Sequence, residues 1–272
     1  MMEPEPVEAI GPPDHTRMPM IDLSNSSLEA LWCAAPAQFS IHPDEVHVWR
    51  AGLDVAASVL RDLQATLAAD EQARAARFCS AVDRERYAAG RGILRTLLGR
   101  YLGVAPGELR FRYNHQGKPA LAPGSAGQDL RFNISHSQGL ALFAFALGRD
   151  LGVDLEYVQP SLRSDELAER FFSAQEIAAL RSFPQNAQTE MFFHCWTRKE
   201  AYIKARGEGL DIGLDSFSVS LESGGSDNPS IVSDVCTDAR RWSLRPLAPD
   251  KGYVGAVAVE GAGWSLALWQ WP

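Results

Sequence analysis

Apolar residues follow the spacing of short strands in several parts of the chain. Val46–Trp49 alternates like a half-buried strand, and Leu140–Leu147 is an unbroken apolar run, typical of a strand buried on both faces. From Phe217 onward the pattern predicts short strands separated by Gly, Ser and Asp turns. The chain is therefore expected to contain buried strands.

Two other regions have the composition of helices. The first covers residues 53–102, and the second begins near Gln188 and includes the stretch Trp196–Ala205, which is free of Pro and Gly. Gly207 and Gly209 follow this stretch and are typical helix stop signals. Helices and strands are both expected in one fold.

One face of the second helix is chemically unusual. Trp196, Glu200 and Lys204 lie at i, i+4 and i+8 and therefore share this face. A core-facing stripe would not carry a Glu and a Lys, and a solvent-facing stripe rarely begins with a Trp. Either the two charges form an ordinary surface pair, worth about a few tenths of a kcal/mol, or they belong to a functional site.

Composition limits the class of protein. The 272 residues, 46% of them hydrophobic, suffice for one large domain or two of ordinary size. The formal charge of −8 argues against non-specific binding to nucleic acid or to membrane surfaces. No apolar run reaches membrane-spanning length, and the acidic start lacks the order of a signal peptide.

Cysteine usage and the start of the chain add two expectations. The four cysteines are scattered without metal-ligand spacing, at Cys33, Cys79, Cys195 and Cys236. We therefore expect reduced thiols and a cytoplasmic protein. Residues 1–44 contain several prolines and few periodic apolar positions, which predicts a loosely ordered N-terminal extension.

Basic residues are unevenly distributed. The chain has only four lysines among its 26 basic residues: Lys118, Lys199, Lys204 and Lys251. Seven arginines are concentrated in the second half of the first helical region: Arg74, Arg77, Arg84, Arg86, Arg91, Arg95 and Arg100. This positive patch in an acidic protein is either a solvated helix face balanced by acidic neighbours or an anion-binding surface.

A turn is predicted at Asn114–Pro119, where Asn, Gly and Pro occur close together. Such a turn presents backbone N–H groups and the side chain of Lys118 to a docking group, which suits a phosphate. Most turns of this composition only reverse the chain, and that alternative stays open.

Ser135, His136 and Ser137 follow a short strand that begins at Arg131, and we predict that they lie in a polar loop. Adjacent Ser and His residues cannot easily share a proton in line, and no nearby Asp orients the His, so the segment argues against a hydrolase triad. Contact with an anion or a ribose is the functional interpretation, and a loop cap is the alternative.

Asp154 and Glu156 lie one pleat apart in the alternating segment Leu151–Val158 and point to the same face. Two such carboxylates repel each other unless they are solvated or bridged by a cation, and paired oxygen ligands suit Mg²⁺. An exposed strand face is the ordinary alternative for this pattern.

The chain also contains a short internal similarity. Arg77–Ala81 and Arg170–Ala174, which begin 93 residues apart, differ at one position, and the second opens a predicted helix that carries Glu176. An ancient duplication into two similar halves would leave such a trace.

Four motifs occur in the order and spacing of a known family: Gly117–Pro119, Phe132–Ser137, Gly152–Glu156 and Trp196–Lys204. Together they resemble the motif series of the Sfp-type 4′-phosphopantetheinyl transferases over roughly residues 46–260. The family moves the phosphopantetheine arm of coenzyme A to a serine of a carrier protein and releases 3′,5′-ADP.

The resemblance implies an α+β fold of two similar halves related by a pseudo-twofold axis, with the active site in the cleft between them. We expect the N-terminal half at residues 45–138 and the C-terminal half at residues 139–272, after the extension of residues 1–44. It also implies coenzyme A as substrate, Mg²⁺ as cofactor and a monomeric enzyme.

The resemblance further assigns roles to individual residues. Asp154, Glu156 and Glu200 are similar to the Mg²⁺ ligands, and Glu200 also to the base that accepts the proton of the carrier serine. Lys204 matches the lysine that contacts the phosphates, either as an electrostatic clamp or as a proton donor to the leaving group. Glu176 matches an acidic position with a supporting role.

The remaining assignments concern coenzyme A. Lys118, Ser135 and His136 resemble contacts to its 3′-phosphate and adenosine end. Arg74 and Arg86 lie where family members carry basic phosphate contacts.

The implied partners are apo acyl or peptidyl carrier domains of fatty-acid, polyketide or nonribosomal peptide synthases, as in secondary metabolite biosynthesis. Two alternatives come from other classes: a non-catalytic carrier-binding module of the same fold, and a Mg²⁺-dependent phosphoesterase that uses water in place of the serine. A decayed site would have lost one of Asp154, Glu156, Glu200 or Lys204, and all four are present.

Overall fold

The chain has an α+β fold, as the resemblance implies. It is described here as a computed structural model that covers residues 32–36, 39–124, 127, 129–209, 213–221, 231–234 and 241–272. Most of the predicted N-terminal extension, residues 1–31, lies outside these residues.

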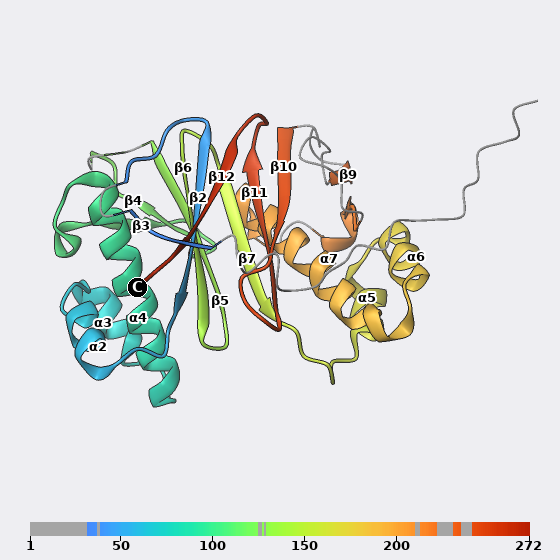
Figure 1. The fold of residues 1–272 in the computed structure, drawn as a ribbon, viewed down its shortest axis with the longest axis horizontal. Helices are drawn as coiled ribbons and strands as arrows, with labels where there is room; N and C mark the ends of the chain where they lie inside the picture. The colour runs from blue at the N-terminus through green and yellow to red at the C-terminus, as the bar shows by residue number, and fades with distance from the viewer. Residues whose placement is uncertain are drawn as a thin grey trace, which may run out of the picture.

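The described strands form four sheets (Figure 1). The five-stranded sheet has the order β1 (Cys33–Ala34), β12 (Ser265–Gln270), β2 (Glu45–Gly52), β6 (Leu140–Leu147) and β5 (Leu130–Ser137). The three-stranded sheet has the order β10 (Trp242–Leu247), β11 (Tyr253–Glu260) and β7 (Leu151–Tyr157). Two small sheets pair β3 (Phe111–Tyr113) with β4 (Pro119–Leu121), and β8 (Phe217–Val219) with β9 (Ile231–Asp234).

Two 22-residue helices cover the two larger sheets (Figure 1). On the five-stranded side lie α2 (Ala57–Gln64), α3 (Ala69–Ala75) and the long α4 (Ala81–Leu102). On the three-stranded side lie α5 (Ser164–Phe171), α6 (Ala174–Ser182) and the long α7 (Gln185–Arg206). The predicted helical regions are confirmed. Gly207 caps the C-terminus of α7, and its φ of 70° is a left-handed conformation that favours glycine.

The apolar residues form three cores that explain the layers. The first lies between α4 and the five-stranded sheet, and the second lies between α7 and the three-stranded sheet. The third joins the inner faces of the two sheets. Strand β6 serves two cores, since Phe143 and Phe145 face α4 whereas Leu142 and Ala144 face the other sheet. This confirms the prediction of a strand buried on both faces.

The chain crosses between the sheets twice after β5. Strand β6 pairs antiparallel with β5 and β2, and β12 returns to pair parallel with β2. The five-stranded sheet therefore contains strands from both predicted ranges, 45–138 and 139–272. The division into two related halves stays a prediction.

The described end of the N-terminal segment packs on the fold. The Trp32 indole N–H donates to the carbonyl oxygen of Ala248 at 2.7 Å, and the Arg50 guanidinium lies over the Trp32 ring. Strand β1 then pairs with β12. Residues 32–34 are thus held by a hydrogen bond, a cation–π contact and a strand ladder.

The serine that the two similar stretches share has the same local role in each. Ser80 caps α4 by accepting a hydrogen bond from the Asp83 N–H, and Ser173 caps α6 in the same way from the Glu176 N–H. The first stretch precedes the long helix of its sheet, but the second precedes the short helix α6. Shared capping chemistry therefore accounts for the serine that the two stretches have in common.

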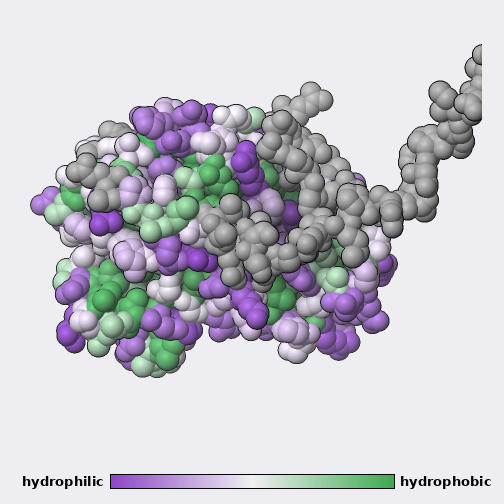
Figure 2. Space-filling model, viewed as in Figure 1, coloured by the Kyte–Doolittle hydropathy of each residue, from purple (hydrophilic) through white to green (hydrophobic). Residues whose placement is uncertain are grey.

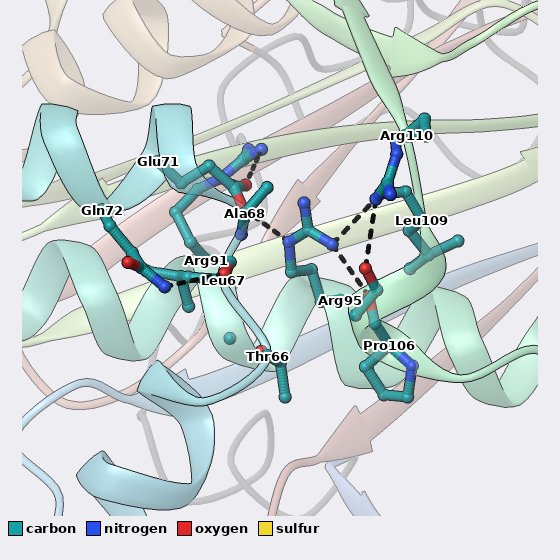
Figure 3. A network of polar contacts seen from close by, with 12 residues as sticks. Thr66, Leu67, Ala68, Glu71, Gln72, Arg91, Arg95, Pro106, Leu109 and Arg110 are labelled. Carbon is teal, nitrogen blue, oxygen red and sulfur yellow. Dashed lines mark hydrogen bonds and ion pairs between the residues drawn. The ribbon is translucent and has the colours of Figure 1, made fainter.

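Part of the predicted arginine patch is buried. Arg91 and Arg95 both donate to the carboxylate of Glu71, at 2.7 and 2.5 Å between nitrogen and oxygen, and all three are at most 8% exposed (Figure 3). Arg95 also donates to the carbonyl oxygens of Pro106 and Leu109. These two arginines tie α3, α4 and the following loop together, so for them the prediction of a surface patch is wrong.

The described surface is mixed in polarity. On the face shown in Figure 2, hydrophilic and apolar residues alternate, and apolar residues gather over the α2–α4 region at the lower left. Val59 and Val82 are among the exposed large apolar side chains. Among the helices that the structure describes, none combines the length and the apolar composition needed to cross a bilayer.

Gly152 allows α7 to lie directly on β7. A Cβ atom at this position would stand 2.1 Å from the Ala201 carbonyl oxygen and 2.3 Å from the Ala205 nitrogen. Gly152→Ala is therefore expected to push α7 away from the strand and to lower the free energy of unfolding by about 2–3 kcal/mol. Thermal and urea unfolding measure the loss, with Gly52→Ala as a control at a glycine that has open space around it and no left-handed φ.

Candidate active site

The two larger sheets meet along a polar seam. Strands β5 and β7 are the edge strands of their sheets, and side chains of β5 receive hydrogen bonds from the β7 backbone. Val153 N–H donates to Asn133 Oδ1 at 2.8 Å, and Tyr157 N–H donates to Ser137 Oγ at 3.1 Å. The seam thus fixes the position of β7 relative to β5.

Alternate residues of β5 point into this seam. Ser135 and Ser137 follow Asn133 at the period of a strand, so the prediction of a polar loop at residues 135–137 is wrong. The sequence predicts that Ser137 belongs to an anion-contacting segment and assigns no role of its own to Asn133, although the two-residue spacing of three polar side chains indicates that they share one face of a strand. His136 lies on the opposite face and is exposed.

The serines of β5 contact the carboxylates of β7. Ser135 Oγ donates to Asp154 Oδ1 at 2.9 Å, and Ser137 Oγ donates to Glu156 Oε2 at 3.0 Å. Asp154 is 2% exposed, so it lies far deeper than an ordinary surface carboxylate. This burial argues against the alternative of a solvated strand face.

Helix α7 brings a cation to the same place. Lys204 Nζ lies 2.5 Å from Asp154 Oδ1 and 3.0 Å from Ser135 Oγ. Glu200, one turn earlier, lies within electrostatic range of the cluster. The alternative of a simple surface pair between Glu200 and Lys204 does not describe the site, because the Lys204 ammonium contacts Asp154. The structure thus brings together residues that are far apart in the sequence.

The carboxylates of the cluster repel one another. Burial and then the Asp154 charge raise the pKa of Glu156, whereas the Ser137 hydrogen bond and Lys204 oppose this rise. Burial, Asp154 and Glu156 likewise raise the pKa of Glu200, opposed by Lys204. Three carboxylates against one ammonium form a site that favours additional positive charge.

The geometry of the cluster bears on the predicted metal ligands. Among the described residues, no three His, Cys, Asp or Glu side chains are already arranged around a common metal position. In the same part of the chain, Asp154 Oδ2 is buried without a hydrogen-bond partner. An unpaired buried carboxylate oxygen beside two further carboxylates fits a hard divalent cation.

Two predicted arginine contacts lie beyond the seam. Arg86 forms a bidentate pair with Asp54, at 2.7 and 2.8 Å, and this pair is partly exposed. Arg74 is exposed and lies over the Tyr87 ring.

Partial desolvation and then the charge of Lys204 lower the pKa of His136, which favours a neutral imidazole near pH 7.

The N–H groups of the turn after β3 bond within the turn, contrary to the prediction that they face a docking group. Asn114 Oδ1 accepts hydrogen bonds from the N–H groups of Gln116 and Lys118, and Gly117 N–H donates to the Asn114 carbonyl oxygen. These three N–H groups are therefore committed within the turn and are not presented to a phosphate.

The side chain of Lys118 is also occupied. Its ammonium donates to the carbonyl oxygens of Leu151 and Lys204, at 3.0 and 2.5 Å. Burial lowers the Lys118 pKa to about 8. A pocket of about 200 Å³ lies beside it, between the β3–β4 turn, β5 and the end of α7.

A buried ion pair joins α7 to α6. Lys199 Nζ lies 2.6 and 2.7 Å from the two Glu176 oxygens and donates to the Phe217 carbonyl oxygen at 2.7 Å. The Glu176 oxygens also accept the N–H groups of Ser173 and Val219. This saturated carboxylate links α6, α7 and β8, and its partner Lys199 has no role in the prediction from the sequence.

Comparison with known proteins gives concordant matches. Residues 150–258 match the 4′-phosphopantetheinyl transferase superfamily, and residues 55–146 match the N-terminal part of 4′-phosphopantetheinyl transferases. The chain is 45% identical to the 4′-phosphopantetheinyl transferase HetI of Nostoc sp. over 244 residues, which cover 90% of this chain and all of that one. It is 34% identical to Sfp of Bacillus subtilis over 156 residues, which cover 57% of this chain and 67% of Sfp.

Proposed function

Because the chain belongs to the 4′-phosphopantetheinyl transferase superfamily, we propose that it moves the phosphopantetheine arm of coenzyme A to a carrier-protein serine and releases 3′,5′-ADP. The observation that carries this proposal is the seam cluster of Asp154, Glu156, Glu200 and Lys204, in which acidic oxygens and one ammonium face each other.

Glu200 is the base of the proposed reaction. Its carboxylate accepts the proton of the carrier serine, directly or through water, as the serine oxygen bonds to phosphorus and the bond to 3′,5′-ADP breaks. Burial and the neighbouring carboxylates raise its pKa, which makes it a stronger base than an exposed Glu.

Asp154, Glu156 and Glu200 are proposed to hold Mg²⁺. The support is the donor set itself, together with the buried oxygen of Asp154 that has no partner among the described residues. When bound, the ion neutralises negative charge on the phosphoryl oxygens. Ser135 and Ser137 orient two of these carboxylates through their hydroxyl groups.

Contacts to coenzyme A are proposed around the same seam. Ser135 and His136 reach the adenosine end and its phosphates, and Arg74 and Arg86 supply positive charge. Arg86 can exchange its partly exposed partner Asp54 for a phosphate at little cost, since such surface pairs contribute about 1 kcal/mol or less. For Lys118, direct contact of its ammonium with coenzyme A is one of two alternative roles.

Lys204 is proposed to be an electrostatic clamp on the phosphates. Lys204→Arg keeps the charge and is expected to retain activity within about tenfold, whereas Lys204→Ala should lose on the order of a hundredfold in kcat/KM. Steady-state rates from pH 6 to about 10 distinguish this role from proton donation. A donor role predicts that Arg behaves like Ala and that the alkaline limb of the profile moves.

The acceptors are proposed to be acyl or peptidyl carrier domains of fatty-acid, polyketide or nonribosomal peptide synthases. A monomer in the cytoplasm is the proposed form, consistent with the free thiols of Cys79 and Cys195.

The decisive experiment incubates apo-carriers of all three classes with the protein, coenzyme A and Mg²⁺ and follows their mass. The expected result is the addition of one phosphopantetheine to the carrier serine. Hydrolysis of coenzyme A without a carrier would instead indicate a phosphoesterase, and carrier binding without modification would indicate a non-catalytic module.

A further inference from the structure

We propose that the turn Asn114–Lys118 is a latch that caps the C-terminus of α7 and thereby positions Lys204. The inference rests on the proposed function, in which Lys204 contacts the reacting phosphates. It makes Lys118 a positioning residue that acts through α7, in place of a direct contact to the nucleotide.

The end of a helix leaves carbonyl groups without partners inside the helix, and cations near these groups are favourable. In α7 the Gly207 N–H donates back to the Ile203 carbonyl oxygen. The next carbonyl oxygen, that of Lys204, accepts the Lys118 ammonium at 2.5 Å. Asn114 Nδ2 donates to the Gly207 carbonyl oxygen at 3.0 Å. Two side chains of the turn therefore satisfy two carbonyl groups at the end of α7.

The turn is rigid enough to act as a latch. Asn114 Oδ1 bridges the N–H groups of Gln116 and Lys118, and the Asn114 N–H donates to the Lys118 carbonyl oxygen. Gly117 has a φ of 79°, which lets the chain close this tight turn without strain. Asn114 and Lys118 are consequently presented to α7 in fixed positions.

The contact surface is closely fitted. A Cβ atom on Gly209 would stand 2.5 Å from the Gln116 side chain, so the turn packs against the residues that follow α7. Lys118 also donates to the Leu151 carbonyl oxygen at the start of β7. The ammonium therefore joins three segments: its own turn, β7 and α7.

This arrangement holds Lys204 at both of its ends. The backbone carbonyl of Lys204 bonds to Lys118, and the side-chain ammonium of Lys204 bonds to Asp154. Two of the three N–H donors of Lys118 are committed to carbonyl groups, which leaves one for any ligand. Loss of Lys118 should accordingly displace the last turn of α7.

The test compares Lys118→Met with Lys251→Met, a control at an exposed lysine in the β10–β11 turn. Lys118→Met keeps the length of the side chain but donates no hydrogen bond. We expect kcat to fall on the order of tenfold to a hundredfold, with the KM for coenzyme A changed by less than about threefold. Hydrogen exchange should accelerate at residues 203–207 and stay unchanged in α4.

Asn114→Ala is the second variant, since Asn114 is exposed and its replacement does not bury an unpaired group. It should show the same pattern with a smaller loss of kcat. A raised KM for coenzyme A with unchanged kcat and unchanged exchange in α7 would overturn the proposal and favour direct nucleotide contact. Unchanged kinetics and exchange in both variants would overturn it as well.

The exchange measurement also separates this proposal from the proposed function. If the wild-type protein transfers no phosphopantetheine, the proposed function fails, but faster exchange at residues 203–207 in the variants still supports the latch. If transfer proceeds and the variants exchange like the wild type, only the latch is wrong.

Discussion

Glu176→Ala should destabilise the protein by about 3–5 kcal/mol, because it leaves the Lys199 ammonium buried without a counter-charge. Lys199 is 0% exposed and Glu176 1% exposed, so water cannot replace the lost carboxylate. The Ser173 and Val219 N–H groups would lose an acceptor at the same time. Urea unfolding followed by circular dichroism measures the change.

A matched control separates burial from charge pairing. Glu169 pairs with Arg181 on the surface of the same region, and Glu169→Ala should cost about 1 kcal/mol or less. The double variant Glu176→Met with Lys199→Met removes both charges and should recover most of the stability. If Glu176→Ala costs no more than the surface control, the buried pair does not hold α7 as inferred.

Asp154→Asn should lower kcat/KM by on the order of a thousandfold, since it removes several kcal/mol of charge stabilisation from the proposed metal site. The substitution keeps the size of the side chain, but its amide carries no charge for Mg²⁺ or for Lys204. Transfer to an apo-carrier is measured by mass, and Mg²⁺ binding is measured separately by calorimetry.

Asp62→Asn is the control for Asp154→Asn. Asp62 is exposed on α2, and its substitution is expected to leave both the rate and the Mg²⁺ affinity unchanged. Thermal unfolding must confirm that Asp154→Asn is folded. A folded variant that modifies carriers at the wild-type rate would remove Asp154 from the proposed metal ligands.

The sequence determined the local elements and the identity of most seam residues. Alternation placed Asp154 and Glu156 on one face of a strand, and helical spacing placed Glu200 and Lys204 on one face of α7. Both patterns depend only on the geometry of the backbone, which has the same period in every protein. The order of four motifs was enough to recognise the family.

Only the tertiary structure decided which of these faces meet. Ser135 and Ser137 were expected in a loop. They lie on β5 instead, because the neighbouring strand β6 supplies backbone hydrogen-bond partners. Arg91 and Arg95 had the composition of a surface patch, and only the packing of α3 on α4 provides the carboxylate that neutralises them. Local sequence contains no information about a partner 20 or 24 residues away.

Lys118 illustrates the same limit at the site. Its turn was predicted from Asn, Gly and Pro, and this local prediction was right. The direction of its ammonium depends on the end of α7, which is 86 residues later in the chain. The sequence by itself determined that a lysine stands in this turn, and the tertiary structure decided that it meets helix carbonyl groups, because only folding brings those groups within hydrogen-bonding distance.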